Sequence, residues 1–340
     1  MPIERAIATS IVQIAPEATP GLSVPATKRL SSLSIALAPD ADVAFQGPTG
    51  YLFDTTSVVN REWSTSDVSG LPAYTELQYP LSSLMGTAVI TTPATAVLSR
   101  DWVFNIVHNR QGTPKTYTVE QGDVDAGTSE RAAYCFFNAL DMSFSREGGT
   151  DLGGSVMGQI IDFDFALTDP TTVTGIPQVP IQPNEVNVFL DLDSADIGNT
   201  QWVDAFTIGW SIADRWNVGY PLNRSKPSYD RHYATKPDPT MTFSVANNPV
   251  GRDLIEYFRQ RQTVFIRIDA LGPVIETIGT GPGVDFHHMY QMDLAVQLSA
   301  AFSPADINGL ATLDWTGRIV YDATWDKAMT AKIRNSQAAL

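Results

Sequence analysis

Acidic residues two positions apart are the pattern in this sequence that is closest to catalytic or metal-binding chemistry. Asp162 and Asp164 alternate with phenylalanines, and Asp191 and Asp193 flank a leucine. Residues two apart on a strand point to the same side, so either pair could bind calcium or serve as the two carboxylates of a glycoside hydrolase. The solvated side of a sheet requires the same alternation, and we interpret both pairs as exposed strand residues.

The histidines and the one cysteine give no stronger indication of chemistry. His287 and His288 are adjacent, so on a strand they point to opposite faces and make a poor pair of metal ligands. Cys135 lies in an apolar run and cannot form an internal disulfide, so we expect a buried thiol. The sequence has no Gly-x-Ser-x-Gly turn, no Gly-x-x-x-x-Gly-Lys loop and no His-Glu-x-x-His motif. We therefore predict a protein that is not an enzyme and that uses no metal and no cofactor.

The balance of charge limits the partners that the chain can have. Its 340 residues include 37 Asp and Glu against 22 Lys and Arg, which gives a formal net charge of −15. Tight binding of nucleic acid requires clustered Lys and Arg, so we expect DNA, if it is a partner, to be repelled. The first fifteen residues contain charges and polar interruptions and predict neither a signal peptide nor a membrane span. We expect a soluble protein that is made in a cytoplasm.

Strand patterns position most of these side chains. Residues 288 to 299 alternate between apolar and polar side chains, and residues 264 to 269, 314 to 322 and 186 to 193 do the same. A period of two is typical of a half-buried antiparallel strand. His288 falls on the apolar side of its run and is expected in the core.

The two halves of the chain repeat one order of elements. A strand-like run, a polar turn and a second run occupy residues 133 to 162, and the same order recurs over residues 288 to 322. Gly158 of the first copy aligns with Gly317 of the second. Such self-similarity indicates one structural unit that is used twice.

Each half also contains one helix signal. Asn248 can cap a helix that begins at Pro249 and extends to Gln262. The apolar stripe of this helix comprises Val250, Leu254, Ile255 and Phe258. A shorter helix is expected between Pro80 and Gly86, with its leucines and Met85 facing inward.

These patterns predict a mainly β protein with two tandem domains of the β-sandwich or half-barrel type, each flanked by one α-helix. The first domain is expected over residues 1–167, with an N-terminal arm in which residues 7 to 14 could add as a strand. Residues 168–184 are rich in proline and form a linker that the prolines hold extended, without a hydrogen-bonded ladder. The second domain is expected over residues 185–340, with a C-terminal arm.

Taken together, the residues resemble the major tail tube protein of long-tailed bacteriophages, in the siphovirus type that has a duplicated tube domain. The resemblance is carried by Thr75–Gly86, by Ala139–Arg146 with Gly153–Gly158, and by Gly317–Asn335. It spans nearly the whole chain, and the family is identified by its overall pattern of elements.

The resemblance implies a structural virion protein with no cofactor. Single-domain members form hexameric rings, and duplicated members form trimeric rings with pseudo-sixfold symmetry, in which inner strands join into one β-barrel around a channel. Stacked rings make the tube that conducts the viral genome during infection, and DNA passes without specific binding. The implied partners are further copies of the chain and the tape measure, terminator and distal tail proteins. The implied location is the virion tail, and the host cytoplasm during assembly, with no membrane partner.

Two sets of residues are candidates for these roles. The acidic residues that could face the channel are Asp141, Asp293 and Asp314. Long polar segments before the two helices, residues 45 to 74 and 213 to 240, are the candidate contacts between rings because such loops are usually functional. Their candidate contact residues are Arg61, Glu62, Trp63, Arg215, Trp216, Arg224 and Arg231. Deleting most of residues 213 to 240 is expected to leave a folded chain that no longer elongates.

Two alternatives remain open at this point. One is a different β protein of the virion, such as a capsid decoration or tail terminator subunit. The other is a carbohydrate-binding or carbohydrate-active β-sandwich, for which Asp191 and Asp193 are the candidate carboxylates.

Overall fold

A computed structural model of the chain describes residues 9–124, 127–163, 165–223, 228–279, 283–300 and 302–340. Strands predominate in this part of the chain, so the expectation of a mainly β protein is confirmed. The first elements are β1 (Ile11–Pro16), β2 (Lys28–Leu30), β3 (Leu33–Ala36), β4 (Pro39–Gln46), β5 (Thr56–Gly70), α1 (Gln78–Leu84), β6 (Val89–Thr91), β7 (Arg100–Asn105), β8 (Tyr117–Asp123), β9 (Thr128–Ser145) and β10 (Gly149–Gly158). The later elements are β11 (Thr174–Gly175), β12 (Val186–Asp191), β13 (Ala205–Ile212), β14 (Trp216–Gly219), β15 (Arg231–Ala234), β16 (Thr240–Ala246), α2 (Pro249–Gln260), β17 (Val264–Ile278), β18 (Val284–Leu298), β19 (Ser303–Ile307), β20 (Leu310–Ile319) and β21 (Met329–Asn335).

The pairing order of the strands repeats between the two halves. In the first half β1 pairs with β8, β8 with β9, β9 with β10, β10 with β5, and β5 with both β3 and β4. In the second half β12 pairs with β17, β17 with β18, β18 with β20, β20 with β16, and β16 with β13. The corresponding strands follow one another in the same order along the chain, with α1 before β8 and α2 before β17. This is the arrangement expected of one unit used twice.

Two further pairings join the halves. Residues 140 to 145 of β9 pair antiparallel with residues 207 to 212 of β13, and β21 at the end of the chain pairs with β7. Buried apolar residues of both halves also form one connected core. No sheet of the described chain closes on itself, so a closed barrel is not a property of one chain. The domain boundaries stay a prediction.

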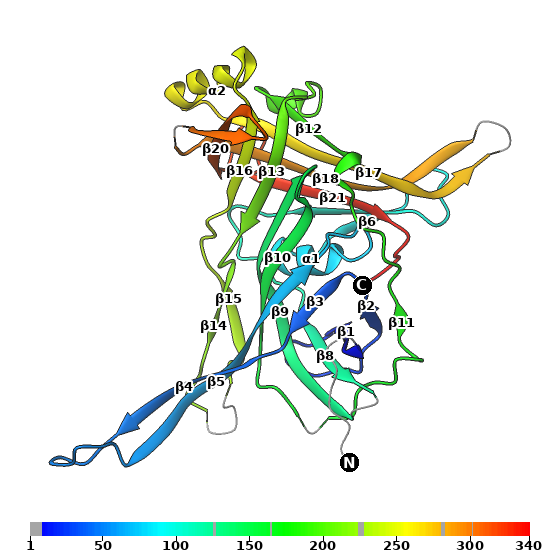
Figure 1. Cartoon of the computed structure of the whole chain (residues 1–340). Helices are drawn as coiled ribbons and strands as arrows, with labels where there is room; N and C mark the ends of the chain where they lie inside the picture. The colour runs from blue at the N-terminus through cyan, green and yellow to red at the C-terminus, as the bar shows by residue number, and fades with distance from the viewer. Residues whose placement is uncertain (1–8, 125–126, 164, 224–227, 280–282, 301) are drawn as a thin grey trace.

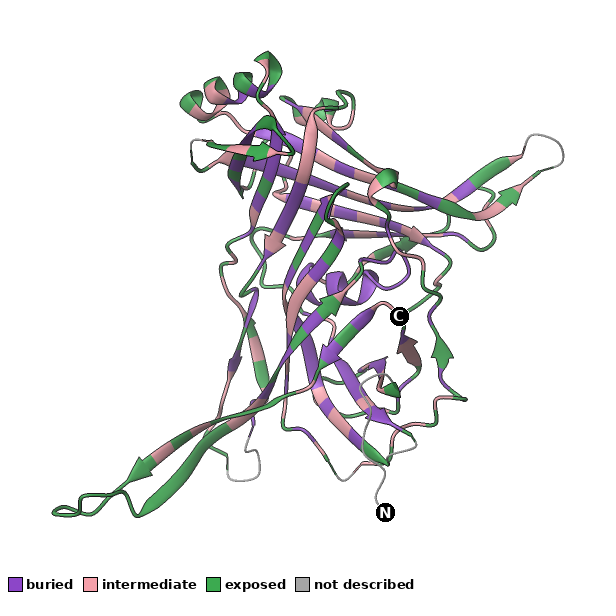
Figure 2. Ribbon diagram, viewed as in Figure 1, coloured by how far each residue is buried: buried purple, intermediate pink, exposed green. Residues whose placement is uncertain are grey.

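Two long hairpins project from the body of the molecule. The β4–β5 hairpin extends to the lower left in Figure 1, and the β17–β18 hairpin extends to the upper right. Buried residues gather in the body, whereas the outer end of the β4–β5 hairpin is exposed at every residue except the half-buried Ala44 (Figure 2). We call residues 43 to 59, at the outer end of this hairpin, the arm.

α2 is less buried than expected from the sequence, and α1 is more buried and begins earlier. α2 begins as predicted, because the Asn248 side chain accepts a hydrogen bond from the Gly251 N–H at 2.8 Å. Leu254 is buried, but Val250 of the predicted apolar stripe is 54% exposed. α1 is fully buried and begins two residues before Pro80. A proline fits there because the N–H groups of the first helical turn have no partner within the helix.

The long polar segments are not loops. Residues 45 to 74 consist largely of β5, paired with β4 in the projecting hairpin. Residues 213 to 240 contain the hairpin of β14 and β15, and Trp216 and Tyr229 are buried in a second apolar cluster with Tyr134 and Phe136. Deleting residues 213 to 240 would therefore remove part of a core, and the expectation that the rest would stay folded is withdrawn.

The linker and the described segments nearest the two ends of the chain are held against the body. Within the described residues, β1 lies between β2 and β8, and β21 lies between β18 and β7, so neither projects as an arm. Residues 7 and 8 lie outside the described residues. The linker is mostly extended, but β11 forms a short parallel pairing with β2, and Ile176 and Ile181 are buried. The expectation of a linker without any ladder is corrected in this respect.

The aligned glycines occupy corresponding positions. Gly158 of β10 lies opposite Ser64 of β5, and Gly317 of β20 lies opposite Met241 of β16. A Cβ added at Gly158 would lie 2.6 Å from the Ser64 hydroxyl, and one added at Gly317 would lie 2.4 Å from Cγ1 of Val296. Both strands therefore need a residue without a side chain at this place.

Gly317→Ala should lower the free energy of unfolding by about 1–3 kcal/mol, because the new methyl group overlaps Val296. Val296→Ala removes the overlapping carbon, so the double variant should lose less than the sum of the single losses. Urea unfolding of the four proteins in this cycle measures the coupling. Strictly additive losses would show that the two side chains do not compete for space.

Candidate assembly surface

One long sheet runs through both halves. Its strand order is β3 and β4 at one end, then β5, β10, the second part of β9, β13, β16, β20 and β19 at the other end. Successive side chains on a strand point to opposite sides. In β9, Leu140, Met142 and Phe144 are buried on one side, and Asp141 and Ser143 are exposed on the other. We call the second side the polar face.

Small hydrophilic side chains make up the polar face. Its hydrophilic exposed and half-buried members include Ser34, Thr65, Asp67, Ser69, Asp141, Ser143, Asp151, Ser155, Thr207, Ser211, Thr240, Thr242, Asp314, Thr316 and Arg318, and Met157, opposite Thr65, is a half-buried apolar residue on the same side. Four of these are carboxylates and one is a guanidinium. Arg318 is paired with Asp238 at 2.8 Å, so the face as a whole is acidic. A two-sided sheet with one apolar and one hydrophilic side is expected to cover a core and to face water.

Two of the three acidic residues predicted to face a channel lie on the polar face. Asp141 lies opposite Gly153, where an added Cβ would be 2.6 Å from the Asp141 carboxylate, so glycine leaves room for this group. Partial burial, and the nearby negative charge of Asp151, raise the pKa of Asp141. Asp314 accepts a hydrogen bond from the Ser244 hydroxyl at 2.6 Å.

The third residue, Asp293, lies elsewhere. It belongs to β18, between β17 and β21, and it is 5% exposed. Its two carboxylate oxygens accept hydrogen bonds from Arg267 at 2.6 and 3.0 Å, and Gln291 donates a third. Asp293 therefore stabilises the β17–β18 pairing and is not part of the polar face.

The long sheet ends in two edges that lack a neighbour among the described residues. β19 pairs with β20 alone, and the segment from β3 to β4 pairs with β5 alone. An unpaired edge presents free N–H and C=O groups that can accept another strand. Each edge carries one proline, Pro39 or Pro304, which removes a donor and limits indiscriminate pairing. The sequence analysis missed both edges.

The arm carries large apolar side chains in contact with solvent. Phe45 is 68% exposed, Tyr51 70%, Leu52 93% and Phe53 82%. A cluster of this kind on a projecting hairpin is typical of a site that another molecule covers.

Three predicted contact residues lie at the base of the hairpin and touch the other predicted contact segment. The Arg61 guanidinium lies 5.3 Å from the ring centroids of both Trp63 and Tyr220, and Ser228 donates a hydrogen bond to the Glu62 carbonyl at 2.7 Å. The two segments that the sequence analysis assigned to contacts between rings therefore meet within one chain.

The remaining predicted contact residues have different environments. Arg215 and Trp216 are buried, and the Trp216 indole N–H donates to the Ser83 carbonyl of α1 at 2.9 Å, so they offer little surface to another chain. Arg231 is exposed and paired with Asp230 at 2.9 Å. Arg224 lies outside the described residues.

Comparison with protein-family models and with curated proteins finds no match to this chain.

Three carboxylates of the two pairs have partners in the local structure. Asp191 is buried, where it accepts hydrogen bonds from the N–H groups of Gly198, Asn199 and Thr200, and Asp193 accepts one from Ala195. The expectation that both pairs lie on a solvated strand is corrected, because the buried Asp191 carboxylate organises the turn after β12, Asp193 lies beyond the end of β12, and Asp162 lies beyond the end of β10. Asp162 forms an ion pair with Arg131 at 2.8 Å, and Asp164 lies outside the described residues.

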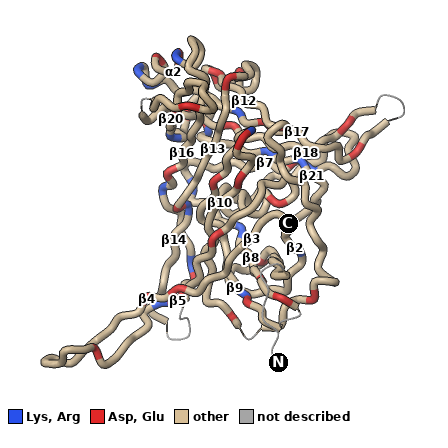
Figure 3. Tube along the Cα trace, in the orientation of Figure 1, with Lys and Arg blue, Asp and Glu red and all other residues tan. Residues whose placement is uncertain are grey.

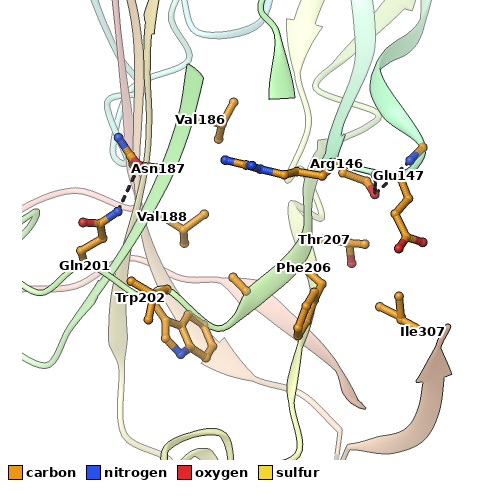
Figure 4. A pocket seen from close by; sticks show the side chains of 14 residues that line it. Arg146, Glu147, Val186, Asn187, Val188, Gln201, Trp202, Phe206, Thr207 and Ile307 are labelled. Atoms are coloured by element: carbon orange, nitrogen blue, oxygen red, sulfur yellow. Dashed lines mark hydrogen bonds between the residues drawn. The ribbon is translucent and has the colours of Figure 1, made fainter. Parts of the chain in front are cut away.

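A cavity beside the long sheet has a volume of about 650 Å³. It lies between β12, β13 and the β9–β10 turn, and Figure 4 shows its lining by Val186, Val188, Trp202 and Phe206. Among the polar groups drawn there, Gln201 donates a hydrogen bond to the Asn187 side chain, and the Glu147 carboxylate accepts one from Asn308. Glu147 is the only Asp or Glu among the described residues that line the cavity, so the cavity lacks a pair of carboxylates.

Metal ligands and membrane spans were also sought in the described ranges. No group of three or more His, Cys, Asp and Glu side chains in these ranges could hold a metal ion. No described helix is long and apolar enough to cross a membrane.

Proposed function

We propose that the chain is a tail tube subunit of a long-tailed bacteriophage, as its resemblance to that family implies. The observation that carries the proposal is the long sheet: it contains two copies of one strand arrangement, a joint between the copies and an unpaired edge at each end. A sheet that ends in two such edges can close only by pairing with other chains, and closure removes both edges.

The number of strands agrees with this proposal. Each chain contributes eight strand positions to the long sheet if β3 and β4 count as one, and each half contributes four of them. Three chains would therefore supply twenty-four positions in six equivalent groups. Such a ring would have the pseudo-sixfold symmetry that the resemblance implies.

The polar face supports a channel role. In a closed ring with its apolar side turned toward the core, the Ser, Thr, Gly and Asp residues of the polar face would line the inner surface. Acidic positions lie near β10 in Figure 3, and the whole chain carries a net charge of −15. DNA phosphates bind where Lys and Arg gather, so this lining would let DNA pass without adhering. The proposed partners are sister subunits and other tail proteins, in the virion and in the host cytoplasm during assembly.

Negative-stain microscopy of the purified full-length chain tests the proposal. We expect stacked rings or tubes, with sixfold features in end-on views and an open channel. A capsid decoration or tail terminator subunit should not polymerise alone. Dispersed single molecules at high concentration would contradict the proposal, and glycan binding by such molecules would favour the carbohydrate-binding alternative.

A further inference from the structure

We infer that the contact between neighbouring chains repeats the β9–β13 joint inside the chain, so that β19 of one chain pairs antiparallel with residues 36 to 41 of the next. This inference rests on the proposed function, and it specifies the partner strands and their register. It follows from the repeated pairing order. Each free edge strand of the long sheet corresponds to a strand of the other half of the chain, and these two corresponding strands, the second part of β9 and β13, already pair with each other.

The first step identifies the counterpart of β19. Gly158 and Gly317 align β10 with β20, so Gly153 of β10 corresponds to Thr312 of β20. Gly153 pairs with Asp141 of β9, and Thr312 pairs with Ala305 of β19. β19 therefore occupies, in the second half, the place that the second part of β9 occupies in the first half.

The second step identifies the counterpart of β13. The same glycines lie opposite Ser64 and Met241, which aligns β5 with β16. Ser64 pairs with Pro39, and Met241 pairs with Trp210 of β13.

A second pair of positions gives the same alignment. Three residues further along each strand, Asp67 pairs with Ala36 and Ser244 pairs with Thr207. Residues 36 to 41 therefore correspond to residues 207 to 212, and no bulge in either ladder changes the register between these two positions.

The register of the contact between chains then follows from the joint inside the chain. In that joint Ser143 lies opposite Gly209, and Asp141 lies opposite Ser211. The counterparts are Ile307 opposite Ala38 and Ala305 opposite Asp40, with the two members of each pair on different chains.

The surroundings of both edges leave room for this pairing. Ala36, Ala38 and Pro304 are exposed, and Ala305 and Ile307 are half-buried. Addition of a strand would pair the backbone of both edges, and at residues 36 to 41 it would replace the hydrogen bonds that the N–H groups of Leu37 and Ala41 donate to the side chains of Gln121 and Asp40. Because the two edges differ, the contact is head-to-tail, and it closes into a ring when the rotation per chain divides the circle.

A disulfide tests the register directly. A Cβ added at Gly209 would lie 3.5 Å from the Ser143 Cβ, which is within the range for a disulfide. The variant Ser143→Cys/Gly209→Cys should therefore form a bond within one chain and serves as the positive control. Ala38→Cys/Ile307→Cys places cysteines at the corresponding positions of two chains, and Cys135 is buried and does not compete.

After mild oxidation of assembled protein, a denaturing gel without reductant should show that Ala38→Cys/Ile307→Cys joins most chains into one covalent species of closed-ring size. Ser34→Cys/Ile307→Cys, which is four residues out of register, should give at least tenfold less of this species. Rings or tubes in the microscope without this cross-link, or with equal cross-linking of the control, would overturn the register and leave the proposed function standing. Failure of the unmodified chain to assemble at all would overturn both.

Discussion

A chain whose arm is shortened should fold normally and fail to form tubes. The change replaces residues 44 to 58 by an Asn-Gly turn, so that Val43 and Val59, which already pair, are joined by a two-residue hairpin connection. The variant loses the four large apolar side chains at the end of the arm. Because these are 68 to 93% exposed, their removal should change the stability of the isolated chain very little.

Assembly should respond differently, since exposed apolar groups of this size gain free energy only when another molecule covers them. We expect the shortened chain to form single rings that do not stack, because the edges of the long sheet are unchanged. Size-exclusion chromatography and negative-stain microscopy would distinguish rings from tubes, and thermal unfolding would report the fold.

A matched variant separates arm length from arm chemistry. Tyr51→Ser, Leu52→Ser and Phe53→Ser together keep the hairpin at full length and remove its apolar end. The same loss of stacking is expected if apolar contact drives the interaction between rings. Tubes of normal length from both variants would show that the arm does not join rings.

Strands with one buried side could be predicted from the sequence because their pattern is local. The alternation over residues 288 to 299 and 264 to 269 corresponds to β18 and β17, whose apolar positions are buried. The Asn248 cap with Pro249 likewise identified the start of α2. In each case one short segment contains the whole signal.

The hairpins could not be predicted in this way because they have no buried side over much of their length. The outer half of β5 is exposed at every residue, so apolar and polar positions do not alternate there. The composition of such a segment is that of a loop, although its backbone is paired with β4. β14 and β15 were missed for a related reason, because β14 has only two buried residues and β15 only two half-buried ones.

Whether an acidic residue is buried depends on partners outside its own strand. Asp293 lies on an alternating strand and was a candidate for an exposed position, but Arg267 on the neighbouring strand pairs with it in the interior. Asp191 is buried because three N–H groups of the following turn converge on it. Neither partner set can be read from the spacing of the acidic residues themselves.

The repeat connects the fold to assembly more firmly than any single side chain does. A duplicated β unit whose internal joint is an edge-to-edge strand pairing contains, within one chain, an example of the contact that its free edges can make. The sequence indicated the duplication through Gly158 and Gly317, but the joint itself required the register of β9 and β13. For this reason the cross-link tests a geometric consequence of the fold within the ring that the proposed function requires.

Glu76→Ala should be the most destabilising single change considered, at about 3–5 kcal/mol. The Glu76 side chain is fully buried just before α1, and it accepts hydrogen bonds from the N–H groups of Ser31 at 2.7 Å, Ser32 at 3.0 Å and Leu33 at 3.0 Å. Alanine would leave three N–H groups without this partner, of which that of Leu33 is buried and those of Ser31 and Ser32 are in part-buried hydrogen bonds, and a buried donor without a partner costs about 1–3 kcal/mol. A loss of this size is a large part of the total stability of a typical domain.

The substitution Glu76→Ala should destabilise the chain by disturbing the position of β3. The turn that Glu76 organises leads directly into that strand and into the edge at residues 36 to 41. Glu76→Gln keeps one acceptor oxygen and should lose less than Glu76→Ala. Glu256→Ala, at an exposed carboxylate on α2, is the matched control and should change the free energy of unfolding by less than about 0.5 kcal/mol. Urea unfolding measures all three variants. If Glu76→Ala unfolds with a change as small as that of the control, the buried carboxylate does not hold the turn, and the edge at residues 36 to 41 must be positioned by the β3–β5 pairing alone.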